Sequence, residues 1–166
     1  MDQLTLDEVV GLYESVGWSA YTSEPQLLLE AVQRSTFWVT ARDHGALVGL
    51  ARCLSDDFSI FYLQDVLVQP RDQRHGIGSA LLNRCLSRFD HVRQRVLLTD
   101  DEEHQHRLYR AAGYHDVATL KDTKLHAFVN IKDQNLGLPR LWLMFGFRNV
   151  RPPAWRVGGL FRTLLG

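Results

Sequence analysis

Hydrophobic positions recur at helical spacing over the first thirty residues of the chain. Thr5 and Glu8 form a capping box, and the apolar residues that follow them are three to four positions apart, which predicts a first helix ending near a glycine. Ser23 and Gln26 form a second capping box, which predicts a short helix running through Val32. The chain is therefore expected to begin with two helices.

Strand-like runs occupy the next part of the sequence. Residues 36–41 and 46–53 are rich in β-formers, and Asp43-His44-Gly45 between them predicts a hairpin turn. A third apolar run covers residues 60–68 and ends before Pro70. These runs predict three consecutive strands.

The period of the pattern changes to 3.6 residues at Gly76, which predicts a helix. Its apolar face is made of Ile77, Leu81, Leu82, Cys85 and Phe89. Residues 96–99 predict a buried central strand, and residues 103–112 predict another helix. Further strands are expected at 114–120 and 125–131. The resulting order, ααβββαβαββ, indicates an α/β layered sheet.

Charge and composition narrow the range of functions. The 19 Lys and Arg residues balance the 19 Asp and Glu residues, so the chain has no overall field that would attract nucleic acid or an anionic membrane. Cys53 and Cys85 are expected to be buried, reduced thiols, because two distant cysteines without CxxC spacing rarely form a disulfide. The first residues lack the features of a signal peptide, and no apolar run reaches the length of a membrane span, so we expect a cytoplasmic protein.

The segment from Leu63 to Ser79 carries the most chemistry. A strand enters a loop that delivers Gly76 and Gly78 to the first turn of a helix. Unpaired N–H groups and the positive end of the helix dipole attract phosphate there, and arginines in the loop add positive charge. A pyrophosphate is the expected ligand, although two glycines could also serve only to make a tight turn. The P-loop and dinucleotide motifs do not match.

Two motifs resemble those of the GNAT (Gcn5-related N-acetyltransferase) family. Gln73-Arg-His-Gly-Ile-Gly78 resembles the family's [QR]-x-x-G-x-[GA] signature, and it follows Asp65–Pro70, which is similar to the strand leading into it. Leu108–Tyr114 resembles the family's F-Y-x-x-x-G-F motif. The resemblance covers about residues 1–131, which predicts a GNAT domain there. Residues 132–166 are predicted to be a C-terminal extension.

The resemblance implies the GNAT fold, a mixed central sheet flanked by helices, and acetyl-CoA as cosubstrate. It implies that the coenzyme A pyrophosphate is bound by Gln73, Arg74, His75, Gly76, Ile77, Gly78 and Ser79. The backbone of Val66, Leu67 and Val68 would pair with the pantetheine arm, and a bulge in that strand would aim an N–H at the thioester oxygen. By the same resemblance, Tyr109 would protonate the departing thiolate, or else only pack under the sheet.

The general base is left open by the sequence. Several relatives have Glu-Asp in the cofactor strand, whereas this chain has Gln64-Asp65, and an amide cannot accept the proton. Asp65 is the candidate that we name as catalytic, although alternation along a strand could point it to the other face. Asp100, Asp101 and Glu103 are the next candidates. The histidines lack metal-ligand spacing, so no metal site is expected.

The tail from Leu138 to Gly166 combines aromatic, aliphatic and arginine residues without any acidic residue. Packing on the core or on a second copy is the favoured interpretation, which would make the protein a homodimer. Contact with a membrane surface and a cover over the acceptor groove remain alternatives.

Three functions fit these patterns. The first is an N-acetyltransferase that transfers acetyl to a primary amine of a small molecule or peptide by direct attack in a ternary complex. The second is a GNAT-fold module that binds coenzyme A with weak or no turnover, which the change to Gln64 favours. The third is a toxin that acetylates aminoacyl-tRNA, which the balanced charge disfavours because nucleic-acid binders usually present a basic face.

Overall fold

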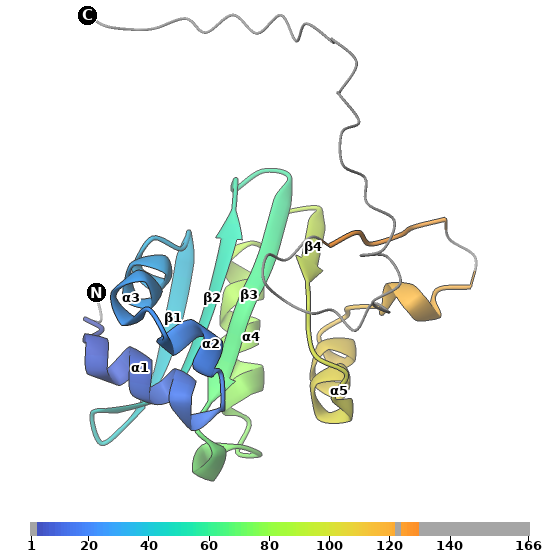
Figure 1. Ribbon diagram of the computed structural model, residues 1–166. Coiled ribbons are helices and arrows are strands. Elements are labelled where there is room, and N and C mark those ends of the chain that lie inside the picture. The colour runs from blue at the N-terminus through green and yellow to red at the C-terminus, as the bar shows by residue number, and fades with distance from the viewer. Residues whose placement is uncertain (1–2, 122–123, 130–166) are drawn as a thin grey trace, which may run out of the picture. The chain divides into compact units, whose positions relative to one another are not determined.

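The computed structural model describes residues 3–121 and 124–129. Its centre is a four-stranded mixed sheet in the order β1-β2-β3-β4 (Figure 1). The first three strands run antiparallel to their neighbours, and β4 runs parallel to β3. The strands are β1 Phe37–Asp43, β2 Ala46–Ser55, β3 Ile60–Val68 and β4 Gln94–Leu97. This is the predicted α/β class with a mixed sheet flanked by helices.

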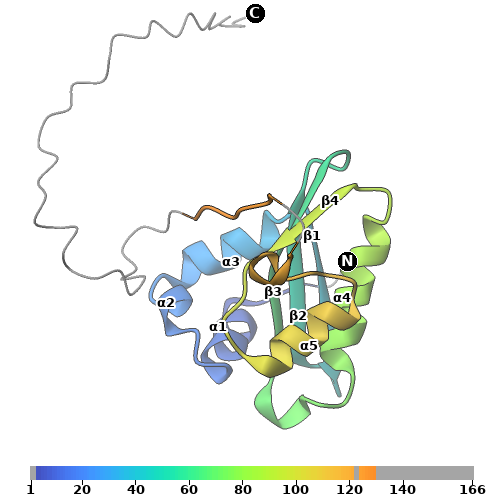
Figure 2. The ribbon, with the colours of Figure 1, turned by 90° about the vertical axis from the view of Figure 1, so that its right-hand side faces the viewer.

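Helices cover both faces of the sheet. They are α1 Leu6–Ser15, α2 Ser19–Thr22, α3 Pro25–Gln33, α4 Ile77–Arg88 and α5 Glu103–Ala111, with short 3₁₀ turns η1 Pro70–Asp72 and η2 Val117–Thr119. The first three helices lie on one side of the sheet and α4 lies on the other (Figure 2). All of these elements belong to one compact unit, which extends to Leu125. No helix among the described residues is long and apolar enough to cross a membrane.

Each face of the sheet has its own hydrophobic core. Residues of α1 and α3 pack on Leu47, Leu50 and Leu67. The other core joins α4 to residues of β2 and β3 on the opposite face. A Cβ on Gly49 would lie only 3.0 Å from Leu81 Cδ1 and 3.1 Å from the carbonyl oxygen of Leu67. A side chain at position 49 would therefore require Leu81 and the Leu67 backbone to shift by a few tenths of an ångström, so glycine favours this close approach of α4 to β2.

Several predicted elements agree with the structure. Thr5 and Glu8 make the capping box of α1: the side chain of each residue accepts a hydrogen bond from the backbone N–H of the other. The β1–β2 hairpin turns through His44 and Gly45, whose φ angles of 45° and 88° suit a tight two-residue connection. The two cysteines are free and buried, as predicted. A hydrogen bond with Cys85, together with burial, raises the pKa of the Cys53 thiol well above its ordinary value.

Two predictions near the N-terminus and in the sheet are wrong. Ser23 does not cap a helix: its hydroxyl donates to the carbonyl oxygen of Ala20, because residues 19–22 form a helix of their own, and α3 begins at Pro25. The strand predicted as central is β4, which forms an edge of the described sheet and is half-buried rather than buried. Leu97 packs, partly buried, against the α4 core, whereas Leu98 is 48% exposed.

The two late strands are also absent from the described part of the chain. Residues 114–120 contain η2 instead, because the Asp116 side chain accepts a hydrogen bond from the N–H of Ala118 and starts a turn. Residues 124–129 form no strand, and the end of the predicted strand at 130–131 lies outside the described residues. The predicted C-terminal extension, with its packing, dimer and membrane alternatives, also lies outside them.

Candidate functional site

A β-bulge interrupts the pairing of β2 with β3. Arg52 pairs with Asp65 and Cys53 pairs with Leu63, so Gln64 is an extra residue without a partner on β2. A bulge of this kind leaves backbone groups of the extra residue outside the ladder and twists the strand. The bulge that the family resemblance implied is therefore present in β3, and it lies at Gln64.

The bulge also changes which face each side chain occupies. Phe61 and Leu63 belong to the α4 core before the bulge, and Val68 belongs to it afterwards, so the alternation changes from odd to even positions. As a result Gln64 and Asp65, although adjacent, both face α1 and α2. The Gln64 amide lies 3.5 Å from the Tyr21 hydroxyl, and Asp65 bonds to Tyr13. The concern that alternation would turn Asp65 to the other face is thereby removed.

Beyond the bulge, one edge of β3 has no strand partner. Parallel pairing with β4 runs from Ile60 to Leu63 and stops there. The chain after β4 then leads to α5, as Figure 1 shows. Within the described ranges, the edge of residues 64–68 on that side is left unpaired, while the side chains of Leu67 and Val68 are buried in the two cores. The backbone at the predicted pantetheine residues, Val66, Leu67 and Val68, is thus available to an added strand.

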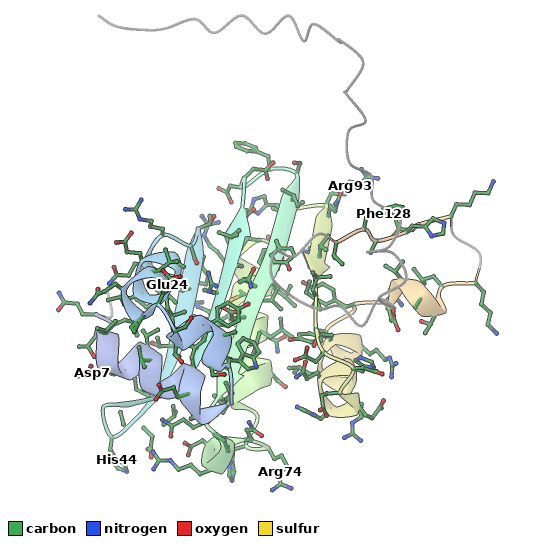
Figure 3. All side chains as sticks on the ribbon, in the orientation of Figure 1. Asp7, Glu24, His44, Arg74, Arg93 and Phe128 are labelled. Carbon is green, nitrogen blue, oxygen red and sulfur yellow. The ribbon has the colours of Figure 1, made fainter. Side chains whose placement is uncertain are left out.

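The loop after β3 is held in place by glutamine side chains. The Gln73 amide donates to the carbonyl oxygen of Val68 at 3.0 Å, and the Gln69 amide donates to that of Leu47, also at 3.0 Å. Arg74 has a φ of 64°, an unfavourable left-handed conformation for a residue with a side chain. Figure 3 shows the Arg74 side chain projecting from this loop, where an anion could reach it. His75 is exposed and bonds to the Asp72 carbonyl through Nδ1 at 3.3 Å.

Helix α4 begins without a side-chain cap. Its N-cap is Gly76, with φ 81°, and no atom lies within 4 Å of a Cβ placed there. A Cβ on Gly78 would make only ordinary contacts, at 3.7 Å from Val68 and 4.0 Å from Leu108. Internal packing therefore does not require glycine at position 78. The open backbone of residues 76–79, with Ser79 exposed, is suited to an anion that approaches closely.

Tyr109 is positioned by the way α5 ends. The N–H of Gly113 donates to the carbonyl of Arg110, and the N–H of Tyr114 donates to that of Tyr109, both at 3.0 Å. Gly113 has a φ of 87°, so this is a Schellman motif with glycine at its left-handed position. The sequence Tyr-x-x-x-Gly-Tyr therefore forms the C-terminal cap of α5.

Burial raises the pKa of the Tyr109 phenol above its ordinary value. The charges of Asp65 and Asp100 act in the same direction, and a hydrogen bond with Thr99 opposes them. The phenol therefore keeps its proton throughout the neutral range. Whether Tyr109 donates that proton during a reaction stays a prediction.

Asp65 lies in a buried polar network under the bulge. Its Oδ2 accepts hydrogen bonds from the Tyr13 hydroxyl, at 2.6 Å, and from Arg52 Nε. Burial of the phenol and the neighbouring Asp65 charge raise the pKa of Tyr13 strongly. Burial acts to lower the pKa of Arg52, but the charges of Asp65 and Tyr13 outweigh it and the net shift is upward. The role of Asp65 as a base is not tested by this geometry.

The alternative bases are exposed and lie between β4 and the first turn of α5. Asp101 is 3.7 Å from His106 Nε2, and Glu103 is 3.9 Å from Arg110. Asp100 has no ion pair with any described residue, and its charge contributes to the raised pKa of both Tyr21 and Tyr109. No group of His, Cys, Asp and Glu among the described residues could hold a metal ion.

Comparison with known proteins identifies the family. The model of the GNAT acetyltransferase family matches residues 5–114, which include the bulged strand, the glycine loop and the tyrosine motif. The chain belongs to the GNAT acetyltransferase family. Members of this family generally use acetyl-CoA.

Solved structures agree with this assignment. This GNAT chain resembles a GNAT-family acetyltransferase of Streptococcus pneumoniae TIGR4 with 32% identity and a TM-score of 0.64, over 78% of this chain and 94% of the other. It also shares its fold with an aminoglycoside 6'-acetyltransferase type Ii, at 21% identity and a TM-score of 0.56, over 68% and 76% of the two chains.

A curated relative from Gibberella zeae, whose name classes it with the acetyltransferases, is 38% identical over 60 residues. These residues make up 34% of this GNAT chain and 34% of the relative. The match thus spans about a third of the relative's length.

Sequence reasoning missed the residues that surround Asp65. Tyr13 and Arg52 were assigned only to a helix and a strand, although both reach Asp65. The available signal was an arginine within an apolar strand and an aspartate within the next. Two opposite charges on neighbouring buried strands usually pair, because an unpaired buried charge is very costly.

Proposed function

We propose that this chain is an acetyl-CoA-dependent N-acetyltransferase that acts on a primary amine of a small molecule or peptide, by direct attack in a ternary complex. One observation carries the proposal. The unpaired edge of β3 beyond Leu63 leads through the loop at Gln73 to the uncapped start of α4 at Gly76. An extended arm and a diphosphate need this order of sites.

The residues present suit acetyl-CoA. An extended pantetheine arm can add to residues 66–68 as a strand does, through backbone hydrogen bonds. The diphosphate would be held by the amides of residues 73–79, where Gly76 and Gly78 allow close approach. When bound, acetyl-CoA supplies an acetyl group activated as a thioester.

Tyr109 is the proposed proton donor to the leaving sulfur. An ordinary phenol and a thiol differ in pKa by about 1.5 units, so the donation is uphill by about 2 kcal/mol unless it accompanies bond cleavage. The raised pKa of Tyr109 increases this difference, but it ensures that the proton is present when it is needed. We therefore expect transfer that is concerted with cleavage of the carbon–sulfur bond.

The attacking amine must lose a proton. An amine with a pKa of about 10.4 is neutral in only about one molecule in 2,500 at pH 7, so an acceptor for that proton helps the reaction. Gln64 cannot accept it. Asp65 and Asp100 are the proposed alternatives, together with water that connects them to solvent.

Calorimetry and a thiol-release assay test the proposal. The full chain is titrated with acetyl-CoA and then assayed for free thiol across a panel of amines. The panel contains amino acids, polyamines, peptides and an aminoglycoside, the last because one structural neighbour is an aminoglycoside acetyltransferase. We expect binding and amine-dependent release of thiol. Absence of binding would contradict the proposal.

Two further functions have distinct outcomes in the same assay. Binding without thiol release for any amine would favour the coenzyme A-binding module, which Gln64 supports. Thiol release that requires aminoacyl-tRNA would favour the toxin, although the balanced charge of the chain argues against it.

A further inference from the structure

The strongest unexplained feature is the buried ion pair of Arg52 and Asp65. Asp65 is 2% exposed and Arg52 is 6% exposed, on the face of the sheet that packs against α1 and α3. Burying two charges costs several kcal/mol per ion before their attraction is counted, so such a pair is weak evidence for stability. The alternative explanation is that the pair fixes the local geometry of strands β2 and β3.

The position of the pair indicates that role. Arg52 and Asp65 are register partners, and the next partners, Cys53 and Leu63, skip Gln64. The ion pair therefore stands at the bulge itself. A slip of one residue would remove the bulge and reverse the faces of the strand, and it would separate Arg52 from Asp65.

Hydrogen bonds tie this pair to the helices on the same face. Tyr13 of α1 donates to Asp65 Oδ2 at 2.6 Å. Arg52 Nη1 donates to Ser35 Oγ at 3.3 Å and to the carbonyl oxygen of Ala31 at 3.4 Å, next to and within α3. The bulge is thus linked to α1 and α3 rather than only to β2.

The second oxygen of Asp65 argues in the same direction. Oδ1 is buried and has no hydrogen-bond partner among the described residues, whereas Oδ2 accepts from two donors. A buried polar atom without a partner is destabilising, because it loses its hydrogen bonds to water without replacing them. The carboxylate is therefore oriented by Tyr13 and Arg52 at the expense of its own full hydrogen bonding.

We propose that Asp65 is a positioning residue, which together with Arg52 and Tyr13 fixes the bulge at Gln64 and so sets the backbone that meets the thioester. This role rests on the proposed acetyl transfer. It is an alternative to the role of Asp65 as a proton acceptor for the amine, and it is favoured by the engagement of Oδ2 with two donors and the burial of Oδ1. Tyr13 and Arg52 act through Asp65 in the same way.

The test compares Asp65→Asn and Tyr13→Phe with the wild-type chain. We expect Asp65→Asn to lower kcat about tenfold, as loss of alignment at an oxyanion donor does, with less than about threefold change in the KM for acetyl-CoA. The kcat of Asp65→Asn should be reduced by the same factor near pH 6 and near pH 9, because alignment of the thioester does not depend on the protonation of the amine. A lost base would instead matter less at high pH, where more of the amine is already neutral.

Hydrogen exchange gives a readout that needs no cosubstrate. We expect the amides of residues 60–68 to exchange faster in both variants, with those of α4 unchanged. Glu8→Gln is the matched control, because it breaks another long-range ion pair, with Arg42 at 2.5 Å, that joins α1 to β1 away from the bulge. It should alter neither kcat nor the exchange of residues 60–68.

The outcomes separate this proposal from the proposed function. A wild-type chain that neither binds acetyl-CoA nor releases thiol would refute the function, while faster exchange in the variants would still support the fixed bulge. Folded variants with wild-type kcat and exchange would refute the positioning role, and so would a loss that disappears at high pH. If Asp65→Asn does not fold, Tyr13→Phe decides by the same criteria, since it removes one hydrogen bond and keeps the ion pair.

Discussion

The backbone N–H of Tyr114 donates to the carbonyl oxygen of Tyr109 at 3.0 Å, and the two rings meet edge to face with their centroids 6.2 Å apart. Tyr114 thus holds the backbone of Tyr109 by a hydrogen bond and its ring by an aromatic contact. The Tyr114 hydroxyl is buried without a partner among the described residues, and burial raises the pKa of Tyr114 to about 12.

This pair supplies a matched test of the proposed acid. Tyr109→Phe should lower kcat about tenfold or more, because the donor of the leaving-group proton is lost, while acetyl-CoA affinity stays the same. Tyr114→Phe removes a hydroxyl that bonds to nothing described, so kcat should be unchanged and stability equal or slightly higher. Steady-state kinetics and calorimetry measure both. Equal kcat for the two variants would remove Tyr109 from the mechanism.

The raised pKa of Tyr109 predicts the pH dependence of the reaction. The phenol acts in its protonated form, and its pKa lies above the ordinary value of about 10, so the loss of activity through its ionisation should have its midpoint above about pH 10. Below that pH, kcat should rise as the acceptor amine loses its proton. A pH–rate profile from neutrality to the alkaline limit of folding measures this. A fall in kcat that begins near pH 8 and is absent from Tyr109→Phe would contradict the prediction.

Gly76 is expected to matter for the diphosphate more than for the fold. Gly76→Ala introduces a Cβ at φ 81°, which costs roughly 1–2 kcal/mol in backbone strain, and the methyl group would obstruct an anion at the open start of α4. Gly45→Ala carries the same kind of strain at φ 88° in the β1–β2 turn. Both variants should lose similar stability in denaturant titrations. Only Gly76→Ala should weaken acetyl-CoA binding, by about tenfold or more, and equal affinity in both would place the diphosphate elsewhere.

Asp100 is expected to favour cationic acceptors. Its charge acts on Tyr21 and Tyr109, on α2 and α5, and no described residue forms an ion pair with it. Asp100→Asn should raise the KM of a positively charged acceptor about fivefold, corresponding to about 1 kcal/mol, without affecting the KM of acetyl-CoA. Asp90→Asn is the control, because Asp90 lies near His91 instead and is not a candidate base. An equal effect on a neutral acceptor would rule out a role for the charge.

Glu8 is expected to stabilise the fold except in acid. A hydrogen bond from Arg42, with help from the Thr5 backbone, lowers the pKa of Glu8 to about 2. Since the folded pKa lies below the unfolded value of about 4.3, its contribution is complete above that value and is lost as the pH falls towards 2. Glu8→Gln should cost about 0.5–1 kcal/mol at neutral pH, because the pair keeps contact with water. Urea titrations should show this difference vanishing near pH 2, and a constant difference would contradict the pKa shift.

The parts of the fold that the sequence predicted are those set by local signals. The helix after Gly76 has a 3.6-residue apolar face and a glycine at its start, and both determine α4 directly. The hairpin at His44-Gly45 follows from turn chemistry in the same way. The resemblance to the GNAT family added the loop and Tyr109, because their motifs are short and continuous.

The parts that it did not predict depend on contacts distant in sequence. The edge position of β4 is set by pairing with β3 across more than thirty residues, and a short apolar run does not encode which neighbours it has. The family resemblance implied a bulge in this strand, but its position at Gln64 is set by the pairing of β3 with β2, so no pattern within residues 60–68 locates it. The strand predicted at 114–120 is replaced by a local turn that Asp116 starts, and residues 124–129, the described part of the other late strand, form no strand.

The close packing at Gly49 has a consequence for which thioesters the chain could use. Because a side chain there would press on Leu81 and on the backbone of Leu67, the separation between the start of α4 and the bulged strand is set by packing in the protein's interior. A donor must therefore be long enough to reach from one to the other. Under the proposed function, truncated acetyl thioesters that lack the nucleotide end could pair with the strand but would gain nothing from the start of α4, so the helix would favour the full coenzyme.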